Sequence, residues 1–106
     1  MTAYPDLRLS DQTAQAIRAA DRLVNRDFAL QALRDLLDPE RQLSTWALAG
    51  VIGGHLRRFQ GEPYRRIAQG HRAPQGALEA ALAHCCAGDC PASQRRVFDL
   101  LVDLRL

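Results

Sequence analysis

The hydrophobic pattern of the chain centres on an uncharged run from Leu43 to Gly54, which also contains the only tryptophan, Trp46. Read at helical spacing, the apolar residues of this run and of the turn after it cover more than one side of a helix. One side holds Leu43, Trp46, Ala47, Gly50, Val51 and Gly54, and the other holds Leu48, Ile52, Leu56 and Phe59. A helix that is apolar all round is typical of the middle of a bundle, because no face is left for water. The pattern therefore predicts a buried central helix over about 39–60.

Apolar residues recur every three or four positions before and after this helix and predict further helices. The predicted ranges are 10–25, 27–37, 63–70, 74–88 and 91–104. The boundary at 25–27 stays open, since a single bent helix would satisfy the same pattern. Proline marks the start of four helices, where its missing N–H costs nothing. These prolines are Pro39, Pro63, Pro74 and Pro91. The predicted buried stripe of the first helix consists of Ala14, Ile17, Ala20 and Val24.

No segment alternates apolar and polar residues for long enough to predict a strand, so the predicted fold class is all-α. We expect a compact bundle of about six short helices over residues 10–106, preceded by an N-terminal arm at residues 1–9. A domain of this size buries enough surface to fold without a metal or a disulfide. Within the central helix, Gly50 and Gly54 share a face, which predicts a notch where a neighbouring helix approaches closely.

The charge of the chain is small overall but unevenly distributed. All 14 basic residues are arginines, and the net charge of +2 is too small to indicate nucleic acid by itself. Residues 55–72, however, hold five arginines against Glu62 alone, a formal charge of +4, while the parts before and after each carry −1. The planar fork of arginine suits carboxylates and phosphates.

This basic segment is the predicted binding surface. Its candidate residues are Arg57, Arg58, Tyr64, Arg65, Arg66 and Arg72. Tyr64 would supply an aromatic anchor. Arg57 and Arg58 have a second explanation, because arginine near the C-terminus of a helix also complements the helix dipole.

Three cysteines, Cys85, Cys86 and Cys90, cluster near the end of one predicted helix. Their odd number argues against a secreted disulfide framework. Cys85 falls on the apolar stripe of its helix, where a free cysteine acts as a small hydrophobe. His84, Cys86 and Cys90 are weak candidates for metal ligands, since a closed zinc site needs four. Ordinary reduced cysteines and no cofactor are the favoured interpretation, with a metal- or thiol-dependent sensor at His84–Cys90 as an alternative.

Catalytic patterns are missing from the sequence, so we do not expect an enzyme. There is no glycine-rich phosphate loop and no cluster of carboxylates, and adjacent His84 and Cys85 point about 100° apart on a helix. Residues 64–82 resemble a helix-turn-helix in outline, which makes nucleic-acid binding the alternative function. The second helix of that unit offers Gln75 and Glu79 but no arginine for base edges.

The location and the partner are predicted from the same observations. The N-terminal residues lack the basic and apolar regions of a signal peptide, and the uncharged run is shorter than the roughly 20 residues that span a bilayer. We expect a cytoplasmic protein of bacterial or phage origin that does not bind membranes. The favoured function is a small regulator or inhibitor that binds a protein partner through residues 55–72. A homodimer is compatible with the last helix, where Phe98 and Val102 add apolar surface beside Val97 and Leu101.

Overall fold

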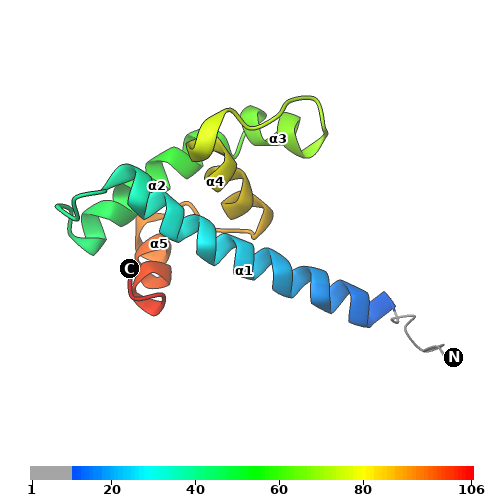
Figure 1. The fold of residues 1–106 in the computed structure, drawn as a ribbon, viewed down its shortest axis with the longest axis horizontal. Coiled ribbons are helices and arrows are strands. Elements are labelled where there is room, and N and C mark those ends of the chain that lie inside the picture. The colour runs from blue at the N-terminus through cyan, green and yellow to red at the C-terminus, as the bar shows by residue number, and fades with distance from the viewer. Residues whose placement is uncertain (1–10) are drawn as a thin grey trace, which may run out of the picture.

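The computed structural model describes residues 11–106, and within this range the fold consists of helices without a strand (Figure 1). The helices are α1 (Asp11–Leu37), α2 (Thr45–Phe59), α3 (Glu62–Ala68), α4 (Gly76–Ala87) and α5 (Gln94–Asp103). The predicted all-α class is confirmed, with five helices in place of about six. The predicted N-terminal arm lies outside the described residues. None of the five helices is both long and apolar enough to cross a membrane.

The count differs because residues 11–37 form a single helix. Neither glycine nor proline occurs in this stretch, so nothing removes a hydrogen bond or weakens the helix locally. At the predicted break, Asp27 does not cap a new helix. Its carboxylate instead accepts hydrogen bonds from the Arg26 guanidinium, the shorter at 2.9 Å.

The helices pack as two pairs that share one hydrophobic core. Helix α1 lies along α4, α2 lies along α5, and α2 also contacts α1, α3 and α4. The largest side chains without exposed surface come from four of the helices: Leu30, Leu33, Ile52, Leu56, Cys85, Val97 and Leu101. Because α2 contacts all four other helices, its buried face joins the two pairs.

The N-terminal half of α1 projects beyond the other helices (Figure 1). Ile17 and Val24 are 46% and 50% exposed, so the predicted buried stripe in this half is wrong. At 100° per residue, Ile17, Val24 and Phe28 fall on one side of the helix and Leu30 and Leu33 on nearly the opposite side. Helix α4 covers the side of Leu30, and no described segment covers the other.

Helix α2 is also less buried than its composition predicts. Trp46 is 48% exposed and meets Phe98 of α5 edge to face, with ring centroids 5.4 Å apart. Val51 is exposed as well, so the prediction of a helix buried on all sides is wrong. The core takes only the face that carries Leu48, Ile52, Leu56 and Phe59.

The predicted helix starts at Pro39, Pro74 and Pro91 come too early in the chain. Helix α2 begins at Thr45, where the Ser44 hydroxyl accepts a hydrogen bond from the Ala47 amide at 3.1 Å. The buried Asp38 carboxylate accepts bonds from the Gln42 and Leu43 amides and holds the preceding turn. Helices α4 and α5 likewise begin two and three residues after their prolines.

A close contact does occur at the glycines of α2, but one of the two glycines differs from the predicted pair. A Cβ atom on Gly50 would lie 2.7 Å from the Gln94 amide nitrogen, and one on Gly53 would lie 2.6 Å from the Ala92 carbonyl oxygen. Gly54 faces only flexible arginine ends at 3.6 Å or more. The notch against the start of α5 is therefore formed by Gly50 and Gly53, not by Gly50 and Gly54.

Two alanine substitutions on α1 test the opposed faces of this helix. Leu33→Ala should lower the free energy of unfolding by about 2–5 kcal/mol, because it leaves a cavity in the core. Ile17→Ala should change it by less than about 0.5 kcal/mol, since this side chain is half exposed and alanine favours the helix. Urea unfolding followed by circular dichroism measures both. A comparable loss for Ile17→Ala would contradict the exposed position of this residue.

The two neighbouring glycines of α2 provide a matched pair of variants. Gly53→Ala should destabilise the protein by about 1–3 kcal/mol, because the new methyl group meets a backbone carbonyl that cannot move aside freely. Gly54→Ala should leave stability unchanged or raise it by up to about 1 kcal/mol, the usual gain of alanine over glycine in a helix. Thermal unfolding of both variants gives the comparison, and equal effects would contradict the assignment of the notch.

Candidate functional site: a groove between α2, α3 and α4

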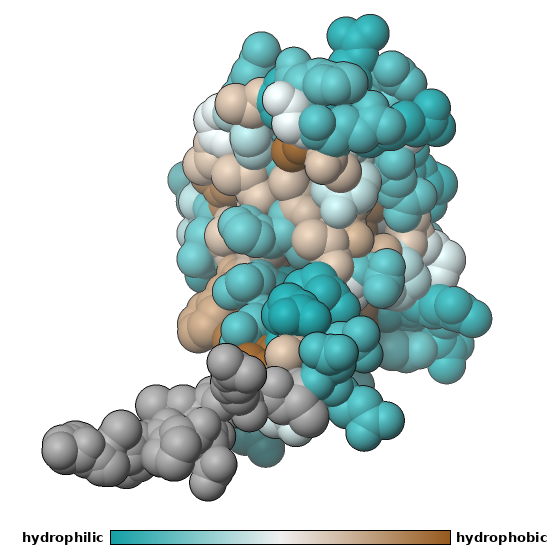
Figure 2. Space-filling view, turned by 90° about the vertical axis from the view of Figure 1, so that its right-hand side faces the viewer, coloured by the Kyte–Doolittle hydropathy of each residue, from teal (hydrophilic) through white to brown (hydrophobic). Residues whose placement is uncertain are grey.

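The basic segment occupies one end of the molecule, where the end of α2, the short helix α3 and the loop before α4 meet (Figure 1). Figure 2 shows that hydrophilic side chains cover most of the upper end of the molecule, where α3 lies. Gly61 separates α2 from α3 and Pro63 stands in the first turn of α3, so the chain turns sharply here. This turn distributes the predicted residues over different surfaces.

A groove of about 260 Å³ lies between α2, α3 and α4 and collects two of the predicted arginines. Its lining consists of His55, Arg58, Phe59, Pro63, Arg72, Leu78, Glu79 and Leu82. Four of these residues, from all three helices, supply an apolar floor: Phe59, Pro63, Leu78 and Leu82. The polar residues form its rim. The site is thus an apolar depression with charges around it.

On the α4 side of the rim, Arg72 is held by Glu79. The Arg72 guanidinium lies 2.6 and 2.7 Å from the two carboxylate oxygens, and both side chains are about one quarter exposed. Glu79 also accepts a hydrogen bond from the Gln75 amide at 2.9 Å, which satisfies a free N–H at the start of α4. This ion pair fixes the loop to α4 and cancels the charge of Arg72.

On the α2 side of the rim, no carboxylate of the described residues neutralises the charge of Arg58. Its guanidinium lies 3.4 Å from the His55 ring nitrogen Nδ1, and no carboxylate of residues 11–106 is within ion-pair distance. Arg58 is exposed, while Phe59 next to it is buried in the floor. An uncompensated positive charge therefore lies directly beside an apolar depression.

Arg65 and Arg66 lie outside the groove on the exposed face of α3. Both guanidinium groups contact the Glu62 carboxylate, at 3.4 and 3.1 Å, and the side chains are 66% and 61% exposed. Exposed pairs of this kind contribute little to stability. Because two arginines share one carboxylate, α3 retains a positive charge near the groove.

Arg57 and Tyr64 belong to other parts of the structure. The Arg57 guanidinium donates a hydrogen bond to the Ala92 carbonyl at 3.0 Å and so ties α2 to the loop before α5. Tyr64 turns away from the groove and packs its ring against Phe59, with centroids 6.3 Å apart. The structure thus brings Arg58 and Arg72 together and places the other four predicted residues around or away from them.

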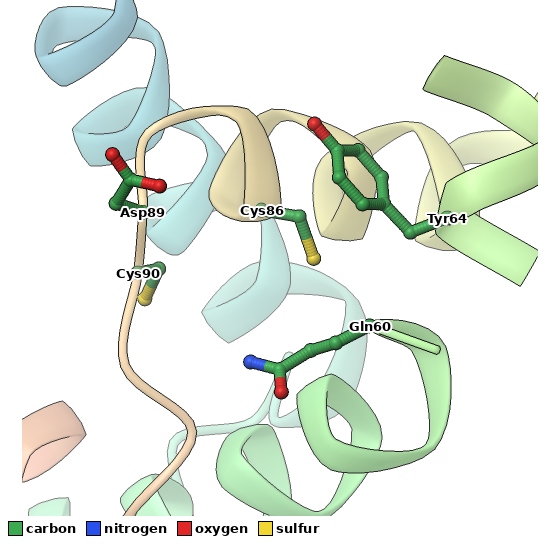
Figure 3. Close-up of a pocket in the computed structure, with 5 residues that line it drawn as sticks. All are labelled: Gln60, Tyr64, Cys86, Asp89 and Cys90. Atoms are coloured by element: carbon green, nitrogen blue, oxygen red, sulfur yellow. The ribbon is translucent and has the colours of Figure 1, made fainter. Parts of the chain in front are cut away.

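A second cavity, of about 310 Å³, lies beside Tyr64 (Figure 3). It is lined by Gln60, Tyr64, Cys86, Asp89 and Cys90. His84 lies elsewhere, in a depression beside Phe28 and Ala29 of α1. Within residues 11–106 no three His, Cys, Asp or Glu side chains are gathered to hold a metal ion. The three weak metal candidates are therefore divided between two places.

The cysteines of this region differ in acidity. A hydrogen bond donated to Cys90, together with burial, raises the pKa of the Cys85 thiol. Burial raises the pKa of Cys86 to about 11, and the charge of Cys90 adds to this effect. The same bond from Cys85 lowers the pKa of Cys90, with help from the Arg26 charge and against the effect of burial. Burial also raises the pKa of Tyr64, and the charges of Cys86 and Asp89 raise it further.

The connection and packing of α3 and α4 differ from those of a helix-turn-helix. Helices α3 and α4 are joined by seven residues, 69–75, whereas that motif uses a turn of about three or four. Helix α4 packs along α1, and its residue Glu79 is engaged by Arg72. None of these features favours the insertion of α4 into a DNA groove.

Several residues of the groove were not predicted from the sequence. Glu79 gave no signal, because its relation to Arg72 depends on how the loop at 69–75 folds back. His55 stands three residues before Arg58 on the same helix, a spacing that the sequence contained. The contact of Cys85 with Cys90 was not predicted either, because a glycine-ended cap would have Gly88 in the left-handed conformation, whereas the structure has Asp89 there.

Comparison of the chain with known protein families, with curated proteins and with solved structures finds no match in any of the three.

Proposed function

We propose that this protein is a non-enzymatic regulator or inhibitor that binds an acidic segment of a protein partner in the groove between α2, α3 and α4. The observation that carries the proposal is the uncompensated charge of Arg58 beside the apolar floor formed by Phe59, Pro63, Leu78 and Leu82. The occupant that fits is a segment with one apolar side chain and a neighbouring carboxylate.

The two parts of the site would contribute in different ways. Burial of one Leu- or Phe-sized side chain on the floor stabilises a complex by about 1.5–3 kcal/mol before the costs of association. A carboxylate that meets the Arg58 guanidinium gains directed, charge-assisted hydrogen bonds. Arg65 and Arg66 extend the positive field along α3 and would speed the encounter with an acidic partner.

The composition of the groove favours binding over catalysis. Its lining contains one histidine, His55, and no serine, threonine, cysteine or lysine that could act as a nucleophile. The only carboxylate, Glu79, is engaged by Arg72 and by the Gln75 amide. A general base would need a free acceptor aimed at a substrate.

A protein partner also fits better than a nucleic acid. An apolar floor has no counterpart on a phosphate backbone, and the charges of Arg65, Arg66 and Arg72 are shared with carboxylates. Phosphate contacts need several uncompensated cations along a strand. The groove offers one uncompensated cation, Arg58.

A charge reversal tests this function. The wild-type chain first serves as bait to capture and identify its partner from the native host. Arg58→Glu combined with Arg65→Glu should then weaken binding of the purified partner at least about tenfold, since it replaces attraction by repulsion at the rim. Helical content and melting temperature should stay nearly unchanged, because both side chains are exposed. Isothermal titration calorimetry measures the affinity.

The matched control carries the same change of charge on α5, away from the groove, as Arg95→Glu with Arg96→Glu. Its affinity should stay within about twofold of wild type, since exposed charges outside an interface act weakly through salt. Equal losses in both double variants would refute the placement of the site. A mobility shift of duplex DNA at about 50 mM salt that disappears as salt rises would support a nucleic-acid function in its place.

A further inference from the structure

Helix α4 ends in a tight hydrogen-bonded cap that contains two of the three cysteines. Asp89 adopts the left-handed conformation, with φ at 55°. The Cys90 amide donates to the Cys85 carbonyl at 2.9 Å, and the Asp89 amide donates to the Cys86 carbonyl at 3.0 Å. These two bonds define the Schellman motif, in which the first and last residues of the bonded loop also bring their side chains together.

In most proteins this side-chain contact is made by two hydrophobic residues. Here it is made by two thiols. Cys85 has no exposed surface, Cys90 is 4% exposed, and the Cys85 thiol donates a hydrogen bond to Cys90. The Cys90 thiol in turn donates to the Pro91 carbonyl oxygen at 3.6 Å. The backbone of the cap therefore brings Cys85 and Cys90 together within one turn of chain.

The two thiols differ in access. Cys90 lines the open cavity with Gln60, Tyr64, Cys86 and Asp89 (Figure 3). Both cysteines belong to the hydrophobic core, but Cys85 has no exposed surface and does not line this cavity. A small molecule in the cavity would meet Cys90, and Cys85 is the thiol that the cap places beside it.

The surroundings fix the cap in place. Gly88 lies against α1, where a Cβ atom would come within 2.7 Å of the Arg26 Cβ. This contact keeps the Arg26 side chain, which is 18% exposed, close to both thiols. Its positive charge favours a thiolate at Cys90, and the neighbouring Asp27 opposes it.

We propose that Cys90 and Cys85 form a redox-reactive pair, in which a small hydroperoxide oxidises Cys90 and Cys85 then closes a disulfide across the helix cap. This inference is independent of the groove and of the function proposed for it. It assigns the attacking and the resolving roles from position: Cys90 at the cavity, Cys85 in the core.

The reaction is balanced as follows. The Cys90 thiolate attacks one peroxide oxygen, an S–O bond forms, the O–O bond breaks, and the leaving oxygen takes up a proton to depart as an alcohol or as water. Cys90 is thereby oxidised by two electrons to a sulfenic acid and the peroxide is reduced. Cys85 then attacks the Cys90 sulfur, an S–S bond forms, the S–O bond breaks, and the hydroxyl group leaves as water with the proton of Cys85.

Acidity supports the same order of events. The pKa of Cys90 is lowered, whereas that of Cys86 is raised to about 11, so Cys90 has the larger thiolate fraction of the two thiols at the cavity. Once Cys90 has lost its proton, the bond that Cys85 donates to it holds the Cys85 proton in place. That restraint ends when Cys90 becomes a neutral sulfenic acid.

The experiment uses the full chain, reduced, freed of reductant and treated with an equimolar amount of hydrogen peroxide. Free thiols are alkylated, and digestion with trypsin and Asp-N separates Cys85 and Cys86 from Cys90, because Asp89 stands between them. Mass spectrometry should show peptide 73–88 linked to peptide 89–95. Wild-type protein in which Cys90 stays reduced, or proceeds to sulfinic acid without a link, would overturn the proposal.

Two serine variants identify the partner of Cys90. Cys86→Ser should form the link at a rate within about twofold of wild type. Cys85→Ser should form it at least about tenfold more slowly and should accumulate a sulfenic acid at Cys90 that dimedone traps. Loss of the link in Cys86→Ser, or a wild-type rate in Cys85→Ser, would overturn the assignment of Cys85. If Cys85→Ser does not fold, the Cys86→Ser result and fragmentation of the wild-type linked peptide still decide between the two.

Discussion

The structure depends on the burial of one face of α2. Ile52 and Leu56 have no exposed surface and lie where the α1–α4 pair meets the α2–α5 pair. Each pair alone would expose the apolar face that it now turns toward the other. The contact at Gly50 and Gly53 adds to this, because it lets the start of α5 approach the α2 backbone, where Arg57 then holds the Ala92 carbonyl. The last turn of α2 is thereby fixed, and with it the position of Arg58 and Phe59 at the groove.

The groove also depends on a contact made at the other end of the basic segment. The loop at 69–75 has few apolar residues to anchor it, and the Arg72–Glu79 pair with the Gln75 amide provides its attachment to α4. This use of Arg72 explains why a segment with a formal charge of +4 presents a site with one uncompensated arginine. Charge counted along the sequence exceeds the charge available at the surface, because part of it is used to hold the fold.

Local sequence rules predicted the elements and the core of α2, α4 and α5, and they failed where the outcome depends on what covers a face. Ile52, Leu56 and Cys85 are buried as their spacing indicates. The spacing of Ile17 and Val24 is equally regular, yet these residues are exposed, because α4 is only 12 residues long and lies on the other side of the 27-residue α1. Periodicity gives the direction of a side chain on its helix and contains no information on the length of the neighbour. The site shows the same limit: the arginines were located as a segment, but which of them share a surface is set by the turn at Gly61 and by the loop at 69–75.

The two sites share one structural boundary, the contact between Phe59 and Tyr64. Phe59 forms part of the groove floor, Tyr64 forms part of the cysteine cavity, and their rings touch at a centroid distance of 6.3 Å. A tilted aromatic pair of this kind contributes about 0.5–1.5 kcal/mol beyond the area that it buries. The boundary explains why Tyr64, which the sequence placed among the binding residues, belongs to the thiol cavity. It also explains why the arginines and the cysteines, which are separated in the sequence, line neighbouring cavities: Phe59 lines the groove, Tyr64 lines the cysteine cavity, and the two rings lie against each other.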